Sequence, residues 1–179
     1  ECKELTAVLY RMNSVNESSE KEVVISCEQA VHNSLSEPFT YTLSEEKNAV
    51  CQLADRVETY LYEPGAALLK AGPYRLLSQR YGVKKLHPNS HLYTSSVQVD
   101  FPGRCFQVTG ISGFGKKEVK ELLGGLEKAN LTVRNFPASV ADLRKKLKLK
   151  EGGDVYLFAT TLQNGEKVLI KCLKPALLS

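Results

Sequence analysis

The sequence lacks any long apolar run. No stretch approaches the roughly 18 to 20 uninterrupted apolar residues that a membrane-spanning helix needs. The first residues, Glu-Cys-Lys-Glu-Leu, contain neither an initiator Met nor the apolar core of a signal peptide. These absences predict a cytoplasmic location without membrane contact, and they indicate that the chain is part of a longer protein.

Motifs for catalysis are also missing. The 179 residues contain no Gly-x-Ser-x-Gly elbow, no His-Glu-x-x-His helix and no acidic metal cluster, and only three histidines are present. Glu63 and Asp100 are isolated carboxylates near prolines, where we expect them to form turns. We therefore expect no catalytic residue, no metal ligand and no cofactor-binding residue in this chain.

Disulfide bonds are not expected either. The number of cysteines is odd, and the five are widely separated: Cys2, Cys27, Cys51, Cys105 and Cys172. No pair has the spacing of a metal clip or a redox motif, and each lies in an apolar or strand-like context. We expect buried, reduced thiols that pack as small apolar side chains.

Charge is distributed unevenly along the chain. The formal net charge of +4 hides 5 Lys/Arg against 11 Asp/Glu in residues 1–62, and 19 Lys/Arg against 9 Asp/Glu in residues 63–179. A strongly basic segment favours contact with a polyanion, and the acidic third would then face something else, such as a neighbouring domain. Chance combined with a need for solubility is the alternative explanation.

The N-terminal third contains short strand patterns. Residues 5–12 and 22–27 predict two antiparallel strands that would be marginally stable alone. Alternating apolar residues predict strands at 39–43 and 57–62. Ser44, followed by two glutamates, predicts the start of a helix that continues into residues 49–54.

The middle of the chain is less regular. The apolar spacing predicts a helical segment over residues 66–81, in which Gly72-Pro73 produces either a kink or two shorter helices. Residues 83–103 are expected to run over the surface as a loop before a short strand. Asp100-Phe101-Pro102-Gly103 is the best internal boundary.

Residues 104–179 have the clearest pattern. Strands and helices alternate in the order βαβαββ, with strands expected at 105–111, 131–136, 155–162 and 167–173 and helices at 116–126 and 139–149. Asn164-Gly165, between the last two strands, is a strong hairpin signal. This order predicts an α+β fold, built as a two-layer α/β sandwich.

Three clusters of residues are candidates for RNA binding. The first lies in the irregular stretch and contains Lys84, Lys85, His87, Asn89, His91 and Tyr93. Single-stranded RNA is bound by cations that contact phosphates and by rings that stack on bases. A structural loop whose polar groups bond the backbone is the alternative. A metal site is disfavoured because Pro88 breaks the helix that would place both histidines on one face.

The second cluster is Lys116 and Lys117, which follow Gly113-Phe114-Gly115. Free N–H groups at a helix start favour anions, and the two lysines add charge. The stretch lacks both the third glycine of a dinucleotide motif and the Lys-Ser/Thr of a P-loop. A plain tight turn is therefore the alternative to a phosphate site.

The third cluster surrounds the end of the helix expected at 139–149. It consists of Arg144, Lys145 and Lys146, joined by Arg134 from the preceding strand. Five cations between residues 144 and 150 exceed what capping of the helix dipole needs, so we expect these side chains to follow RNA phosphates. Stabilisation of the helix end accounts for part of the pattern.

Three ordered segments also carry a resemblance. They are residues 60–72 (YLYEPGAALLKAG), residues 86–95 (LHPNSHLYTS), and residues 133–137 (VRNFP) followed by 143–147 (LRKKL). Together they resemble the C-terminal portion of bacterial class I S-adenosylmethionine-dependent methyltransferases that have a THUMP-like domain. The resemblance covers most of the chain from about residue 37 onward.

The resemblance implies a domain order. In that family a Rossmann-type methyltransferase domain precedes a small ferredoxin-like segment and then the THUMP-like domain. Residues 1–36 would be the trailing strands of the upstream domain, 37–103 the ferredoxin-like segment and 104–179 the THUMP-like domain. The glycine-rich turn that binds the methyl donor has no match here, so S-adenosylmethionine is expected in the missing domain and no cofactor in this one.

The leading hypothesis is that the chain recognises and positions an RNA substrate, such as tRNA or rRNA, for a methyltransferase. Its partners would be that RNA and its own N-terminal methyltransferase domain, and DNA is not expected. The alternative is a protein-interaction or scaffold module whose basic face docks on an acidic partner or on its own catalytic domain.

Overall fold

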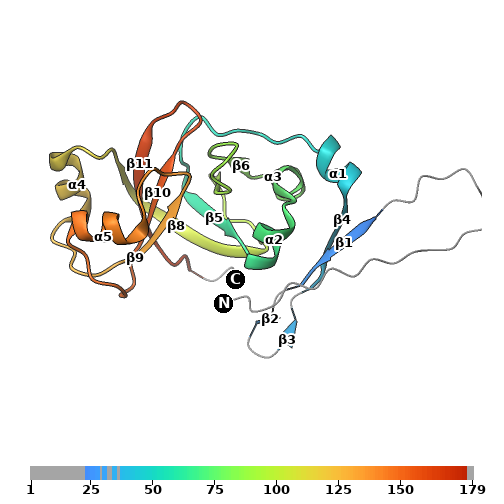
Figure 1. The fold of residues 1–179 in the computed structure, drawn as a ribbon, viewed down its shortest axis with the longest axis horizontal. Coiled ribbons are helices and arrows are strands. Elements are labelled where there is room, and N and C mark those ends of the chain that lie inside the picture. Colours follow the sequence, from blue (N-terminus) through green and yellow to red (C-terminus); the bar gives the residue numbers. More distant parts are fainter. Residues whose placement is uncertain (1–22, 29, 32–33, 36, 177–179) are drawn as a thin grey trace, which may run out of the picture.

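The structure is a computed structural model that describes residues 23–28, 30–31, 34–35 and 37–176 (Figure 1). The strand expected at 5–12 lies outside the described residues. The helices are α1 (Leu43–Asn48), α2 (Ala66–Ala71), α3 (Tyr74–Tyr81), α4 (Lys116–Leu123) and α5 (Val140–Leu147). The strands are β1 (Val24–Cys27), β2 (Ala30–Val31), β3 (Ser34–Leu35), β4 (Phe39–Thr42), β5 (Tyr60–Pro64), β6 (Lys84–Lys85), β7 (Tyr93–Ser95), β8 (Gly103–Ser112), β9 (Asn130–Arg134), β10 (Tyr156–Thr161) and β11 (Lys167–Leu173).

A seven-stranded sheet organises the molecule, with the strand order β6-β7-β5-β8-β11-β10-β9. Neighbouring strands are antiparallel except β9 and β10, which are parallel. From β8 onward the elements follow the predicted order βαβαββ, and β10 and β11 form the hairpin at Asn164-Gly165. The α+β fold class is therefore confirmed. Figure 1 shows α4 and α5 beside β9 at one end of the molecule, and α2 and α3 further along it.

The ladder between β5 and β8 joins the two halves of the chain. It runs from the pair Tyr60 and Gln107 to the pair Pro64 and Gly103. At its end the backbones are so close that a Cβ on Gly103 would lie 2.1 Å from the carbonyl oxygen of Glu63. The predicted boundary at 100–103 is thus the start of a paired strand, and the segments on either side of it share one sheet.

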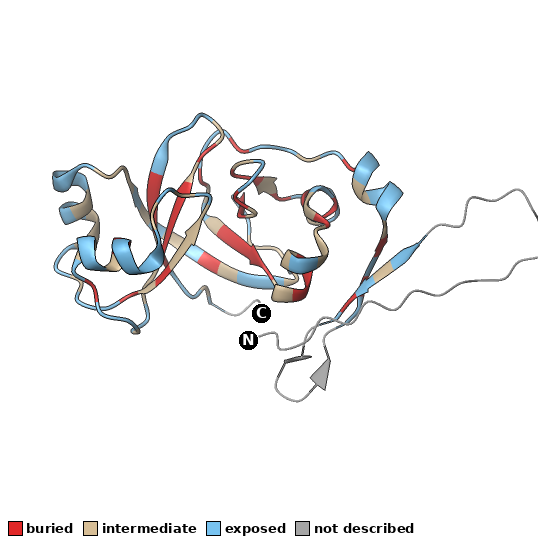
Figure 2. Cartoon of the chain, in the orientation of Figure 1, coloured by how far each residue is buried: buried red, intermediate tan, exposed pale blue. Residues whose placement is uncertain are grey.

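Apolar residues on both faces of this sheet form the core. Leu61 and Tyr62 are neighbours on β5 and point to opposite faces, and both are fully buried. On one face Leu61 packs with Phe106, Phe158 and Ile170 from the other half of the chain. The helices cover the opposite face, with α2 and α3 at one end and α4 and α5 at the other. Figure 2 shows the buried residues concentrated on the central strands, whereas α4 and α5 are mainly exposed.

Helices α1, α2 and α3 begin and end at residues with specific capping conformations. Gly72 ends α2 in the left-handed conformation and Pro73 caps α3, so the Gly-Pro pair separates two short helices, which is one of the two predicted alternatives. The cap of α1 is Thr42 rather than Ser44. Thr42 forms a capping box with Glu45, and the helix ends at Asn48, so the prediction that it continues through 49–54 was wrong.

The expected helices at 116–126 and 139–149 are shorter at their ends. Helix α4 stops at Leu123 because Gly124 adopts the left-handed conformation with φ of 55°. Helix α5 stops at Leu147 because Lys148 does the same with φ of 56°. Each of these two helices is ended by one residue in the left-handed conformation, and the spacing of apolar residues cannot predict where such a residue occurs.

The stretch 83–103 is not the surface loop that its composition suggested. Val83, Leu86, Leu92 and Thr94 are at most 1% exposed, and β6 and β7 add the two outermost strands to that side of the sheet. Strand β1 pairs with β4, and its expected pairing with residues 5–12 lies outside the described residues.

The thiols are free, as expected, although not all are buried. Cys27 and Cys172 are buried, and Cys51 and Cys105 are partly exposed, while Cys2 lies outside the described residues. Burial raises the pKa of the Cys172 thiol to about 12. Across the described ranges, no helix is long and apolar enough to cross a membrane.

Candidate nucleic-acid interface

The residues just after β9 bring together side chains from distant parts of the chain. Asn135 adopts a left-handed conformation with φ of 49° and donates a hydrogen bond from Nδ2 to Nδ1 of His87 over 3.0 Å. Its carbonyl accepts a 2.7 Å bond from the hydroxyl of Thr161. The turn is therefore held on both sides, and it places Arg134 and Phe136 next to the segment that contains His87.

Glu63 binds two arginines at once. Its Oε1 accepts hydrogen bonds from Nε and Nη2 of Arg134 over 3.1 and 2.7 Å. Its Oε2 accepts from Nε of Arg104 over 2.9 Å and from Nη2 of the same side chain. The Glu63 side chain is 3% exposed, whereas those of Arg104 and Arg134 are 55% and 37% exposed. A buried carboxylate thus fixes two guanidinium groups that remain open to solvent.

His91 and Lys85 form the inner part of the same region. The ring of His91 stacks on Tyr74, and Nζ of Lys85 lies 5.0 Å from the centre of that Tyr74 ring. Burial, and then the charges of Lys85 and Arg134, lower the pKa of His91 to about 4. His91 is therefore neutral near pH 7, and the surrounding charge is positive.

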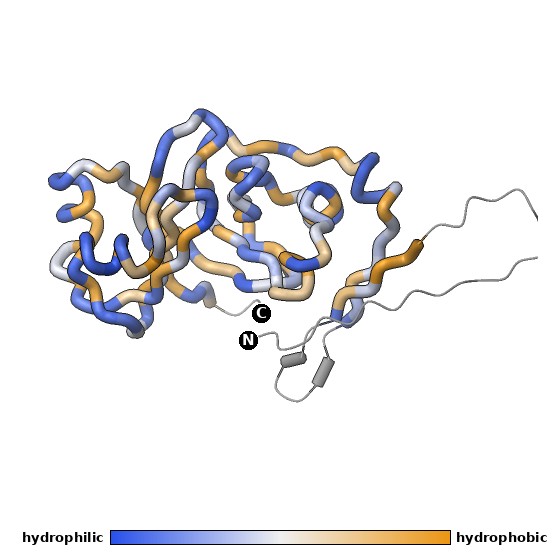
Figure 3. Tube along the Cα trace, in the orientation of Figure 1, coloured by the Kyte–Doolittle hydropathy of each residue, from blue (hydrophilic) through white to orange (hydrophobic). Residues whose placement is uncertain are grey.

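Aromatic residues extend the region toward α5. Phe114 packs on Phe136 with ring centres 4.7 Å apart, and Nζ of Lys146 lies 5.9 Å from the Phe114 ring centre. We define the basic strip as the segment Arg134, Asn135 and Phe136, with His87, which is bonded to Asn135, and with Phe114 and Lys146, which are joined to Phe136 through these ring contacts. Figure 3 shows hydrophilic residues predominating on α5, where the strip ends.

The predicted RNA-binding residues differ in how far they are exposed to solvent. Those that are exposed are Asn89, Lys116, Lys117, Lys145 and Lys146, and those that are partly exposed are Lys84, His87, His91, Arg134 and Arg144. Two of the partly exposed side chains already bond other parts of the protein. Lys84 lies in β6 and pairs with Glu58 over 2.8 Å, and Arg144 donates to the carbonyl of Ala129.

Two predicted residues are buried, which corrects the expectation that their side chains face RNA. Tyr93 is 0% exposed, and its hydroxyl donates to the carbonyl of Tyr74. Lys85 is 4% exposed and donates from Nζ to the carbonyl of Pro88 over 2.6 Å. Both stabilise the segment that carries His87 and His91, as in the alternative of a structural loop.

The turn at Gly113-Phe114-Gly115, before α4, is occupied by the carboxylate of Glu118. A Cβ built on Gly113 would lie 2.6 Å from Oε2 of Glu118, so that carboxylate lies against the turn. A phosphate would have to displace it. The structure therefore favours the tight-turn interpretation there, although Lys116 and Lys117 themselves are exposed.

Sequence reasoning missed Arg104, Tyr74 and the true role of Glu63. Glu63 was expected to form a turn, but it lies in β5 on the same face as Leu61, where alternation directs it toward the core. A carboxylate at such a position needs a cation. That alternation was the available signal, and the identity of the cations depends on contacts far apart in sequence.

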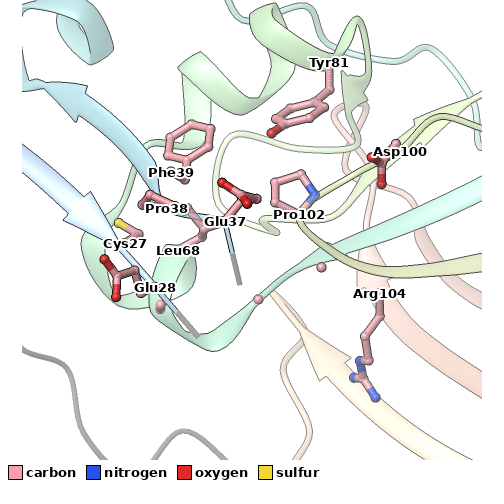
Figure 4. Close-up of a pocket in the computed structure, with 13 residues that line it drawn as sticks. Cys27, Glu28, Glu37, Pro38, Phe39, Leu68, Tyr81, Asp100, Pro102 and Arg104 are labelled. Carbon is pink, nitrogen blue, oxygen red and sulfur yellow. The ribbon is translucent and has the colours of Figure 1, made fainter. Parts of the chain in front are cut away.

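A separate cavity of about 390 Å³ lies between β1, β4, α2 and the segment before β8 (Figure 4). Its lining carries the acidic residues Glu28, Glu37 and Asp100 together with Arg104, and its walls include Phe39 and Tyr81. Its charge is opposite to that of the basic strip. Within the described part of the chain, no group of three or more His, Cys, Asp or Glu residues is placed to hold a metal ion.

Comparisons with known proteins agree with the resemblance. The sequence matches the family model of a ferredoxin-like domain over residues 60–102 and that of a THUMP-like domain over residues 103–174. The structure is similar to a crystal structure described as a candidate methyltransferase from Porphyromonas gingivalis W83, with 38% sequence identity and a TM-score of 0.81. That match covers 90% of this chain and 41% of the other. No protein among the curated ones matches the sequence.

Proposed function

We propose that this chain, a ferredoxin-like domain followed by a THUMP-like domain, recognises RNA for a methyltransferase whose catalytic domain and S-adenosylmethionine site lie outside it. The basic strip is the observation that carries the proposal. It joins two cations, Arg134 and Lys146, to the rings of His87, Phe136 and Phe114, and single-stranded or irregular RNA is bound by that combination of cations and rings.

The side chains of the basic strip would contact different parts of the RNA. Arg134 and Lys146, with the neighbouring exposed Lys145, would neutralise phosphates, which positions RNA without reading its sequence. His87 and the Phe114–Phe136 pair offer partly exposed ring faces on which bases stack. A structured RNA such as tRNA or rRNA presents unpaired bases of this kind in its loops and ends.

The structural neighbour supports the assignment to a methyltransferase. The chain spans 41% of that neighbour, so a catalytic domain in the remainder would have the bound RNA delivered to it. Holding the RNA in one orientation would raise the rate of methyl transfer by positioning. Catalysis and cofactor binding are assigned to that other part because no glycine-rich nucleotide turn occurs in this sequence.

RNA binding by the full chain tests the proposal. If about 4 to 6 phosphates are neutralised, the logarithm of the affinity should fall against the logarithm of salt concentration with a slope of roughly −3 to −4. The double reversal Lys145→Glu and Lys146→Glu should weaken binding to all RNA sequences and flatten the slope by more than about one unit.

A matched control is the double reversal Lys47→Glu and Lys70→Glu. These lysines are exposed on α1 and α2, away from the strip, and the change in net charge is the same. Filter binding should show affinity close to that of the unaltered chain. If both double variants lost RNA affinity equally, binding would depend on the net charge of the chain and not on the basic strip. Unaffected binding in both would leave the protein-interaction alternative ahead.

A further inference from the structure

The most unusual polar group in the structure is the pair of arginines on Glu63. One carboxylate carries one negative charge and the two guanidinium groups carry two positive charges, so the group of Glu63, Arg104 and Arg134 has a net charge of +1. One arginine would suffice to neutralise the buried carboxylate. In the described residues, no other acidic side chain forms an ion pair with either arginine.

Each arginine uses one edge and leaves another free. Nε and Nη2 of both side chains donate to Glu63, and no protein acceptor within the described ranges takes a hydrogen bond from Nη1 of either. A guanidinium group has five N–H donors in a fixed plane. Both side chains therefore present unused N–H donors to solvent, and the hydrogen bonds to Glu63 fix their orientations.

The surroundings add positive charge. Lys85 and Arg134 both lower the pKa of His91, which therefore stays uncharged near pH 7, and the carboxylate whose charge acts on Lys85 is Glu46, not Glu63. Asp100 lines the same cavity as Arg104 but forms no ion pair with it. Figure 4 shows the Arg104 guanidinium directed away from Asp100 and from Tyr81.

We infer that Arg104 and Arg134 form a site for one RNA phosphodiester, with Glu63 as the positioning residue. A phosphodiester carries one negative charge and would bring the group to neutrality. Two oriented guanidinium groups suit its two non-bridging oxygens, because arginine forms bidentate, charge-assisted hydrogen bonds with phosphate. The inference rests on the proposed RNA-binding function and adds to it a specific residue pair, one member of which is absent from the basic strip.

The test is RNA affinity of full-chain variants, measured by filter binding with an unstructured oligonucleotide across a series of salt concentrations. Arg104→Gln and Arg134→Gln should each weaken binding by about tenfold. Because both side chains hold the same phosphate, the double variant should also lose about tenfold and not the product of about a hundredfold. Arg80→Gln is the matched control, since Arg80 pairs with Glu45 on the distant helices α1 and α3.

Two further variants separate geometry from charge. Arg134→Lys keeps the charge beside Glu63 and therefore the fold, but it loses the planar fork, so it should bind RNA more weakly with an unchanged salt slope. Glu63→Gln adds one unit of positive charge. A pure charge effect would strengthen RNA binding, whereas loss of orientation should weaken it. Circular dichroism of each variant confirms that it is folded.

The outcomes are distinguishable. If the unaltered chain binds RNA and the Arg104 and Arg134 variants bind like Arg80→Gln, the shared site is wrong and the proposed function stands. A hundredfold loss in the double variant, or tighter binding by Glu63→Gln, also overturns the shared site. If the unaltered chain binds no RNA, the proposed function and the site fail together.

Discussion

The ring of His91 lies on the ring of Tyr74, with centroids 3.6 Å apart and planes inclined by 17°. His91 has a positive φ of 53°, a conformation that few side chains adopt, so the stack holds a strained residue in place. Tyr74 begins α3 and His91 precedes β7, and their contact therefore fixes the segment between β6 and β7 against a helix.

The acid sensitivity of the fold should depend on His91. The ordinary pKa of 6.5 falls to about 4 in the folded chain, chiefly through burial. The unfolded chain therefore takes up the proton first, and the free energy of unfolding should decrease as pH falls from about 6.5 to about 4. Urea unfolding at pH 7 and pH 5 should show a smaller decrease for His91→Phe, which keeps a ring on Tyr74. An equal decrease in both proteins would contradict this.

Glu63→Gln should lower the stability. The change removes the only charge that balances Arg104 and Arg134 in the described ion pairs, but both arginines can regain water, so we expect a loss of about 1–3 kcal/mol. Glu58→Gln breaks the partly exposed pair with Lys84 and should cost at most about 1 kcal/mol. Thermal and urea unfolding measure both. If both variants lost the same free energy of unfolding, Glu63 would contribute no more to stability than Glu58 does.

Gly103→Ala should be more damaging than Gly110→Ala on the same strand. A Cβ on Gly103 would meet the backbone of β5, which cannot move without breaking the ladder, so we expect a loss of about 2–4 kcal/mol. A Cβ on Gly110 would meet only the end of the Leu122 side chain, which can rotate, and the loss should be about 1 kcal/mol or less. Unfolding midpoints in urea give the comparison, and the reverse ranking would refute the close approach.

Phe114→Leu should weaken RNA binding without changing its salt dependence. Leucine keeps apolar packing against Phe136 but removes the ring face, and stacking of one base is worth about 1–3 kcal/mol. We expect about a tenfold loss of affinity with the slope unchanged, because stacking releases no counterions. A flatter slope would show that Lys146, which lies over that ring, had been displaced.

Local signals predicted some breaks between elements well. Asn164-Gly165 fixes a hairpin within a few residues, and Gly72-Pro73 separates two helices through the conformations of those two residues alone. These features depend on neighbours in sequence. They can therefore be derived from residue types and their spacing.

Features that depend on distant strands were beyond such reasoning. Lys85 and Tyr93 have the composition of an RNA-binding loop, and only the pairing of β6 and β7 with the sheet explains why they are buried. Glu63 and Arg134 are 71 residues apart in the chain, and they meet because β5 and β9 belong to the same folded sheet. The cations of the basic strip and His87 were predicted from the sequence, whereas Phe114 and Phe136 were missed for the same reason.

The ladder between β5 and β8 has a mechanical consequence. Hydrogen bonds run along it to Pro64 and Gly103, where the two family segments meet, and the Leu61 cluster crosses the same junction. A pivot at that junction would have to break both. The two segments must therefore move together at this junction, and any movement that carries a bound RNA toward another domain needs its hinge elsewhere in the protein.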